Sequence, residues 1–194
     1  MIYVLLSRIV TVPDDYYDRS FQERADILSA SIPQLCKSLI FENANFDESC
    51  QEGADDVSYS KFYLVVLQYE AKFDTVKFEN LIWGLRPYQN RLPKSKFNFK
   101  LASAEDNDRL SGYKHNAVTP FGMTTERSKD GVVVESGLRI KHVPVVTCSR
   151  LQTVKPSYIY LGGGEVNVKL GLGLSDFVRV HQPIVGYVSE GREL

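Results

Sequence analysis

The chain has 194 residues, of which 43% are hydrophobic and 24% are charged, so it can bury the core of one ordinary globular domain. Its formal net charge of −1 argues against a protein that coats long stretches of nucleic acid, because such binding needs a broad cationic face, but a short nucleic-acid end stays open as a ligand. The cysteines, Cys36, Cys50 and Cys148, form no C-x-x-C pair and have no metal-ligand spacing, and their odd number favours a reducing compartment such as the cytoplasm.

The first residues predict a strand and then a surface helix. Residues 2–12 are β-branched and apolar, which is typical of a strand or an extended arm. The apolar opening is too short for a signal peptide and lacks a basic segment, and no stretch of the chain reaches the roughly 18 apolar residues of a membrane span. From Asp15 to Ala30, apolar residues recur every three or four positions, so we expect a helix there.

Strands and polar connections alternate in the next part of the chain. Residues 35–42 predict a strand whose only long cation is Lys37, either an edge residue that prevents wrong pairing or a functional group. Residues 43–60 are acidic but lack the ligand order of a calcium loop, so we expect an exposed loop without chemistry. Residues 61–69 are typical of a buried strand, and Asp74 is placed to cap a helix over 75–83.

Residues 91–100 place four cations around Phe97 and Phe99. Such a pattern can follow a nucleic-acid backbone and stack a base, but a strand with its phenylalanines inward has the same pattern and is the reading we favour. Ser103 then begins a capping-box pattern, which predicts a short helix ending at Leu110.

The stretch Leu110–Met123 has the composition of a shaped polar loop, because glycine frees the backbone and proline fixes it. Between Gly112 and Pro120 lie a cation, an imidazole, an amide and a hydroxyl, at Lys114, His115, Asn116 and Thr119. Rigid polar loops often carry sites. A tight connection whose polar groups cap a helix or face water is equally compatible with this composition.

The last third of the chain predicts further strands. Residues 131–135 and 143–147 are rich in branched side chains, and residues 157–173 predict two strands joined at a triple-glycine turn. Ser175 is placed to cap a helix that ends at Val180, and residues 184–189 predict a last strand. The glycines either admit a ligand close to the backbone or form a plain hairpin turn, and their spacing matches neither a P-loop nor a dinucleotide fingerprint.

Three motifs occur in a fixed order: C-K-S-L-I-F from Cys36, L-S-G-Y-K-H-N-A-V-T-P-F-G from Leu110, and Y-L-G-G-G from Tyr160. In that order they resemble the YbaK/ProX family of prolyl-tRNA-synthetase-associated domains, which hydrolyse mischarged aminoacyl-tRNA. The resemblance covers roughly Phe21 to Glu190. It implies a single α/β (α+β) domain over residues 21–194, with a mixed, curved sheet flanked by helices, preceded at 1–20 by an arm or by a strand and the start of a helix.

The resemblance also implies a site. In that family a lysine on a K-[ST]-L strand lies at the substrate pocket, a loop ending in G-x-x-x-P shapes the catalytic end, and a Gly-rich turn lines the opposite wall. The implied catalytic positions here are Lys37, His115, Asn116, Ala117, Val118, Thr119 and Pro120. The implied substrate-binding positions are Gly112, Gly162, Gly163 and Gly164.

The resemblance implies no metal, no cofactor and no serine or cysteine nucleophile. An aminoacyl ester is already activated, so a positioned water and donors for the carbonyl oxygen suffice. Loop amides would be the donors, the ribose hydroxyl beside the ester would help to activate water, and Lys37 would neutralise a phosphate or orient the terminal adenosine. His115 is either a general base or a structural or tRNA-facing residue.

Asn116 is a departure, because the family pattern has glycine at this position. Asparagine tolerates left-handed backbone angles, so the loop shape can survive while its amide narrows or re-polarises the pocket. The expected function is trans-editing of mischarged tRNA at the 3′ acceptor end, with alanyl-tRNA for proline as the first candidate. The alternatives are a non-catalytic tRNA-binding or scaffold module of a multi-synthetase assembly, in contact with aminoacyl-tRNA synthetases, and a hydrolase of small aminoacyl esters.

Overall fold

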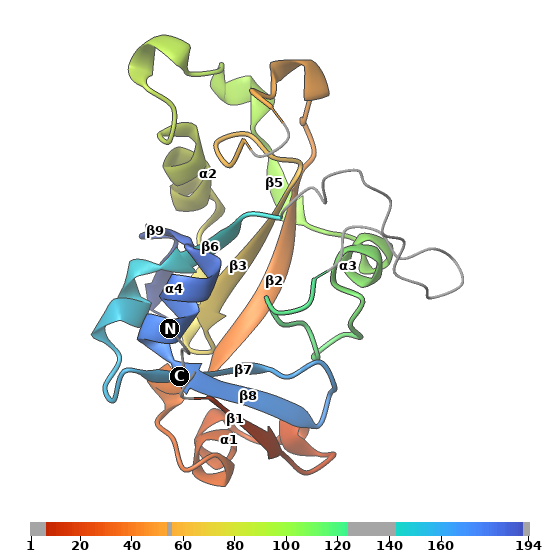
Figure 1. Ribbon diagram of the computed structural model, residues 1–194, viewed down its shortest axis with the longest axis vertical. Helices are drawn as coiled ribbons and strands as arrows, with labels where there is room; N and C mark the ends of the chain where they lie inside the picture. Colours follow the sequence, from red (N-terminus) through yellow and green to blue (C-terminus); the bar gives the residue numbers. More distant parts are fainter. Residues whose placement is uncertain (1–6, 54–55, 124–142, 192–194) are drawn as a thin grey trace, which may run out of the picture.

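The computed structural model describes residues 7–53, 56–123 and 143–191. Its largest sheet has five strands in the order β5-β2-β3-β6-β9 (Figure 1), with these bounds: Phe99–Leu101, Cys36–Asn43, Phe62–Gln68, Val145–Cys148 and Ile184–Gly186. Strand β2 runs antiparallel to β3 and β5, whereas β6 runs parallel to β3 and β9, so the sheet is mixed. The other strands of the described residues belong to two smaller sheets.

The second sheet is antiparallel and lies across the lower ends of β2 and β3 (Figure 1). Its order is β1-β8-β7, with the bounds Ser7–Thr11, Val168–Gly173 and Tyr158–Gly162. An isolated bridge between Leu35 and Tyr160 joins it to the start of β2. The third sheet pairs β4 with β10, at Ala71–Phe73 and Ser189–Gly191.

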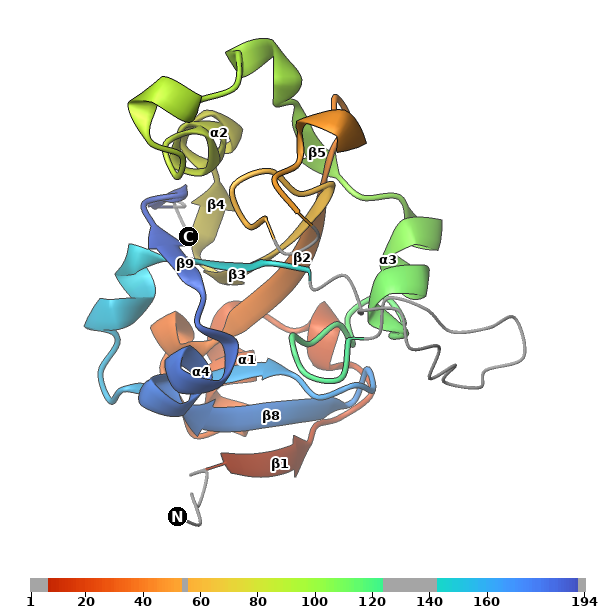
Figure 2. The ribbon, with the colours of Figure 1, turned by 45° about the horizontal axis from the view of Figure 1, so that its top comes forward.

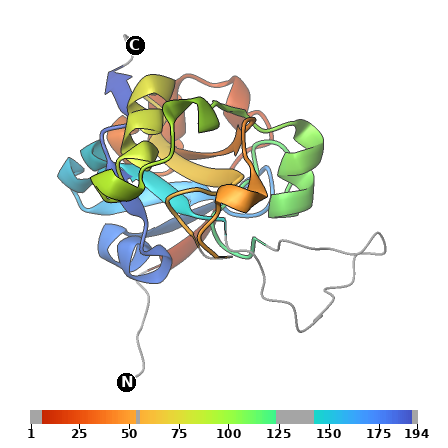
Figure 3. The same ribbon diagram turned by 90° about the horizontal axis from the view of Figure 1, so that it is seen from above.

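Four α-helices, α1 to α4, surround the sheets in the described residues: Phe21–Ile27, Thr75–Trp83, Ala104–Ser111 and Leu174–His181. Helix α2 covers one face of the five-stranded sheet, where Phe78 packs with Val65 and Leu67. Helix α4 covers the other face, where Phe177 packs with Leu64. Figure 3 shows these two helices on opposite sides of β3 and β6. The single mixed α+β domain confirms the predicted fold class, although the second sheet was not predicted.

Capping signals predicted several boundaries correctly. The Asp74 side chain accepts from the Lys77 amide at the start of α2. The Ser103 side chain accepts from the Asp106 amide at the start of α3, which ends at Gly112 in the left-handed conformation, with φ 68°. Phe97 and Phe99 are 5% exposed and point into the core, as the strand interpretation of their segment required.

The helix predicted over residues 15–30 is wrong in its bounds. The structure has a 3₁₀ turn at Tyr16–Asp18 and then α1, which starts at Phe21 after a capping box between Ser20 and Glu23. That box is the physical reason for the late start, because it satisfies the first amides of α1 and fixes Ser20 in an extended conformation.

Other predicted elements are shorter or divided. Residues 91–100 contain a 3₁₀ turn at Lys94–Lys96, and only Phe99–Leu101 pairs as a strand. Ser175 does not cap α4, because the helix already begins at Leu174 with Gly173 as its N-cap. Residues 184–189 divide between β9 and β10, which belong to different sheets. Residues 2–6 and 131–135, both predicted as strands, lie outside the described residues.

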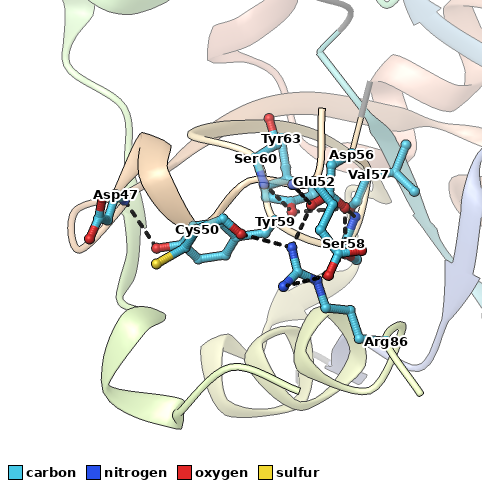
Figure 4. A network of polar contacts seen from close by, with 10 residues as sticks. All are labelled: Asp47, Cys50, Glu52, Asp56, Val57, Ser58, Tyr59, Ser60, Tyr63 and Arg86. Carbon is cyan, nitrogen blue, oxygen red and sulfur yellow. Dashed lines mark hydrogen bonds and ion pairs between the residues drawn. The ribbon is translucent and has the colours of Figure 1, made fainter. Parts of the chain in front are cut away.

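The segment 43–60 is anchored by a buried arginine (Figure 4). Arg86 is 7% exposed, and its guanidinium lies 2.6 Å from the Asp56 carboxylate, which is itself 8% exposed. Arg86 also donates to Ser58 Oγ at 2.9 Å and to the Cys50 carbonyl at 3.0 Å. Burial opposes ionisation of Asp56, but hydrogen bonds from Ser58, from the Glu52 amide and from Arg86 outweigh it, so the pKa of this carboxyl lies below its ordinary value.

We predict that Arg86→Met lowers the free energy of unfolding by about 3–5 kcal/mol, because it leaves the Asp56 carboxylate buried without its cation. The matched control is Lys100→Met, which removes an ion pair with Glu42 from a side chain that is 61% exposed and should cost about 1 kcal/mol or less. Urea unfolding of the three proteins measures the difference. Equal effects of the two substitutions would contradict an anchoring role for Arg86.

Candidate functional site

A cavity of about 430 Å³ opens where β2, α1, α3 and the polar loop after α3 meet. Five of the residues predicted for the site line it: Lys37, His115, Asn116, Val118 and Gly162. In Figure 2 the loop that follows α3 runs toward the ends of β7 and β8. The structure thus brings the lysine strand, the polar loop and the first glycine of the triple-glycine turn to one cavity.

The loop has a closed shape that turns Asn116 toward the cavity. The Ala117 amide donates to the Lys114 carbonyl at 3.0 Å, which forms a tight turn, and Asn116 adopts a left-handed conformation with φ 69°. The Tyr113 hydroxyl donates to the Phe121 carbonyl at 2.7 Å and thereby ties the two ends of the loop together. Asparagine at this position therefore keeps a backbone conformation that is easy for glycine.

Gly162 and Gly164 hold the loop against β7. A side chain on Gly162 would overlap the Val118 carbonyl and come within 3.0 Å of the Ala117 carbonyl. The Gly164 amide donates to the Ala117 carbonyl at 3.2 Å. These contacts leave no space for a Cβ at Gly162, so the loop and the strand can meet only with glycine there.

The remaining predicted positions do not line the cavity. The loop residues Ala117, Thr119 and Pro120 are buried and are not among the lining residues, and Gly112, Gly163 and Gly164 also lie outside the lining. The Thr119 hydroxyl is buried and has no hydrogen-bond partner among the described residues. The buried residues of the loop therefore contribute to its shape.

Within the described residues, no three His, Cys, Asp or Glu side chains are grouped so that they could hold a metal ion.

Lys37 is half-buried, and its ammonium group donates to the Ala71 carbonyl at 3.0 Å. This bond fixes the end of a long flexible side chain beside the cavity. Lys37 therefore places a positive charge at the edge of the cavity.

A cluster of aromatic and cationic side chains at the α1 end of the cavity was not predicted from the sequence. The Tyr17 hydroxyl donates to the Asn116 carbonyl at 2.5 Å and accepts a hydrogen bond from Lys169. The guanidinium of Arg24 lies 5.4 Å from the centre of the Tyr17 ring and donates to the Tyr17 carbonyl. The sequence signal was a lone lysine in the apolar strand V-K-L-G-L, which predicts a buried cation that needs partners.

The pKa of Lys169 is lowered to about 8, mainly by burial and secondly by the positive charge of Arg24. Lys169 is 2% exposed, and its ammonium lies 4.2 Å from the centre of the Tyr17 ring. Burial raises the pKa of the Tyr17 phenol, so this group stays protonated and can keep donating to Asn116 at neutral pH. Lys169 thus holds the Tyr17 hydroxyl, which in turn holds the loop backbone at the Asn116 carbonyl.

We predict that the free energy of unfolding of the wild type rises between pH 8 and pH 10 relative to that of Lys169→Met. In this range the unfolded chain keeps the proton on Lys169, since its pKa there is about 10.4, while the folded protein releases it. The difference between the two proteins should grow by about 2 kcal/mol, and it is free of the opposite contribution of the buried tyrosines, whose raised pKa values favour unfolding as the pH nears 10 in both proteins. Urea unfolding at several pH values tests this, with the exposed Lys72→Met as the control, and an unchanged slope in Lys169→Met would contradict it.

No protein family and no curated protein matches the sequence. Solved structures do match in fold. A crystal structure of a candidate trans-editing enzyme for prolyl-tRNA synthetase is 16% identical with a TM-score of 0.64, covering 95% of this chain and 87% of that one. An epitope scaffold made by computational backbone grafting is 15% identical with a TM-score of 0.64, and the same shares of the two chains are covered. Hypothetical protein APE2540 is 18% identical with a TM-score of 0.61, covering 95% and 91%. These likenesses show a shared fold.

None of the helices in the described residues is long and apolar enough to cross a membrane.

Proposed function

We propose that this protein is a cytoplasmic aminoacyl-tRNA deacylase that hydrolyses the ester of mischarged tRNA in trans, with alanyl-tRNA for proline as the first candidate substrate. The observation that carries the proposal is the convergence of Lys37, His115, Asn116 and Gly162 on one cavity. The fold shared with a candidate trans-editing enzyme for prolyl-tRNA synthetase supports it. The partners would be the 3′ acceptor end of tRNA and, through it, aminoacyl-tRNA synthetases or a multi-synthetase complex.

The cavity suits a charged, partly apolar ligand of modest size. Its volume of about 430 Å³ lies within the usual range for small-molecule sites and can hold an amino acid joined to a terminal nucleoside. Lys37 and Arg24 supply positive charge for a phosphate, and Tyr17, Phe21 and Tyr69 supply aromatic surface for a base. A net charge near zero fits this mode, because the protein would bind only the end of the tRNA.

Hydrolysis would proceed by attack of water on the ester carbonyl. The Ala117 amide already donates to Lys114, so the oxyanion donors would be the neighbouring amides of Asn116 and Val118, which make no backbone hydrogen bond within the described residues. The ribose hydroxyl beside the ester would help to activate the water. His115 is exposed at the cavity and would accept a proton from the water or face the tRNA.

A non-catalytic tRNA-binding or scaffold module is the second candidate. The contact of the Lys37 ammonium with the Ala71 carbonyl favours it, because the lysine already has a structural role. Asn116 in place of the glycine of the YbaK/ProX pattern also favours it, since the amide side chain occupies space at the cavity. Both functions predict tRNA binding, so turnover distinguishes them.

Time courses with a panel of mischarged tRNAs test the proposal directly. The panel pairs tRNA for proline with alanine, cysteine, serine and proline, and includes aminoacyl esters without tRNA. We expect hydrolysis of alanyl-tRNA for proline and little hydrolysis of the correctly charged tRNA. Binding of every tRNA without hydrolysis of any would favour the scaffold, and equal hydrolysis of free esters would show that tRNA is not the substrate.

We predict that Lys37→Ala slows deacylation by about tenfold to a thousandfold, because one charged contact is worth roughly 1.5–4 kcal/mol in the transition state. The matched control is Lys72→Ala, an exposed lysine on β4 outside the cavity lining, which should keep the wild-type rate. Thermal unfolding separates the two roles of Lys37. A variant that melts early but keeps its rate per folded molecule would show that Lys37 is structural only.

We predict that Asn116→Gly widens the substrate range. Glycine adopts the left-handed conformation of Asn116 without strain and leaves its side-chain volume empty, so rates on aminoacyl groups larger than alanine should rise by about tenfold to a hundredfold relative to alanine. Competition between pairs of aminoacyl-tRNAs measures the ratio. An equal change for every substrate would mean that the side chain sets only the loop conformation.

A further inference from the structure

The cavity has two ends with different chemistry. The α1 end carries Arg24 with Tyr17, Phe21 and Tyr69, while the α3 end carries Asn107 and Asp108. Asp108 is the only acidic residue in the cavity lining of the described structure. A ligand with a positive group at one end and a negative group at the other would therefore bind in one orientation.

The two ends are separated along strand β2. The Tyr69 amide donates to the Leu35 carbonyl at 2.8 Å, which places the aromatic end beside the start of β2. The Ala102 amide donates to the Ile40 carbonyl at 2.9 Å, which places the start of α3 beside the middle of β2. The stretch of β2 between these points forms the floor of the cavity.

That stretch of β2 has an open edge at Ser38. Successive residues of a strand direct their backbone groups to opposite sides, so Ser38 and Ile40 share the outer side of β2. Strand β5 pairs with β2 only at Phe41–Asn43, and the bridge from β7 reaches only Leu35. No strand of the described residues therefore pairs with Ser38 on this side, and Ser38 is one of the residues that line the cavity.

Asp108 does little to stabilise its own helix. It is exposed, makes no ion pair within the described residues, and has only a 3.4 Å contact from the neighbouring Asn107 amide group. A carboxylate in the second half of a helix also opposes the helix dipole. A carboxylate without an ion pair in the described residues and a backbone carbonyl outside the strand pairing, both from residues that line one cavity, are suitable acceptors for an ammonium group.

We propose that Asp108 and the open edge of β2 at Ser38 form the subsite for the α-ammonium group of the aminoacyl ester. The carboxylate and the Ser38 carbonyl accept hydrogen bonds from the ammonium, while the nucleotide lies toward Lys37 and Arg24. This inference rests on the proposed function and adds which end of the cavity holds the amino acid. A bound peptide strand is not favoured, because residues of α3 and of the polar loop line the same cavity as this short stretch of β2.

The test compares substrates with free and blocked amines. We expect the wild type to hydrolyse alanyl-tRNA about tenfold to a hundredfold faster than N-acetylalanyl-tRNA, because acetylation removes the charge and two donors. Asp108→Asn should slow hydrolysis of alanyl-tRNA only, so the preference falls toward one. The matched control is Glu105→Gln, an exposed acid on the same helix outside the lining, which should keep the wild-type preference.

A binding measurement separates failure of the subsite from failure of the proposed function. The probe is 3′-deoxy-3′-(alanylamino)adenosine, a stable amide analogue, compared by calorimetry with its N-acetyl form. A preference for the free amine that Asp108→Asn abolishes would support the subsite even in the absence of hydrolysis. Equal hydrolysis or equal binding of free and blocked amines by the wild type and by Asp108→Asn would overturn the subsite while leaving deacylation standing, and no binding with no hydrolysis would overturn both.

Discussion

The absence of a side chain at Gly162 is the constraint on which the cavity depends. The carbonyls of Ala117 and Val118 rest directly on this residue, and the Gly164 amide adds a hydrogen bond to the first of them. The loop consequently lies against the end of β7, and Asn116 lines the cavity. Any larger residue would move the loop carbonyls away from β7, because a backbone atom cannot yield as a flexible side chain can.

Much of the fold could be predicted because the signals are local. Asp74 and Ser103 mark the starts of α2 and α3 through single capping bonds, and the apolar run of β3 predicts a strand buried on both faces. The S-x-x-E pattern at Ser20 also marks the start of α1, but the apolar spacing begins before Ser20 and therefore predicts a longer helix than the structure has. The pairing of β1 with β8 joins residues about 160 positions apart, and no local pattern specifies such a contact.

The candidate site also contains some residues that local sequence motifs indicate and others that only the packing of the elements brings together. Sequence motifs indicated Lys37, the loop and the glycines, but not that Thr119 and Pro120 would be buried outside the cavity lining. Tyr17 and Asp108 were not predicted, because their place at the cavity depends on how α1 and α3 pack around β2. The deacylase and scaffold proposals share this geometry, since both require a site for the tRNA end. They differ in whether loop amides and a water are positioned at the ester.

A crystal structure with the alanylamino-adenosine amide analogue tests the central claim most directly. The account predicts that the analogue occupies the cavity, with its nucleoside toward Lys37 and Arg24, its carbonyl oxygen at the amides of the polar loop and its ammonium at Asp108. Binding at another surface, or in the reverse orientation with the ammonium beside Arg24, would contradict the account. Soaking the Lys37→Ala variant under the same conditions provides the comparison, because weaker occupancy is expected when the nucleoside end loses its cation.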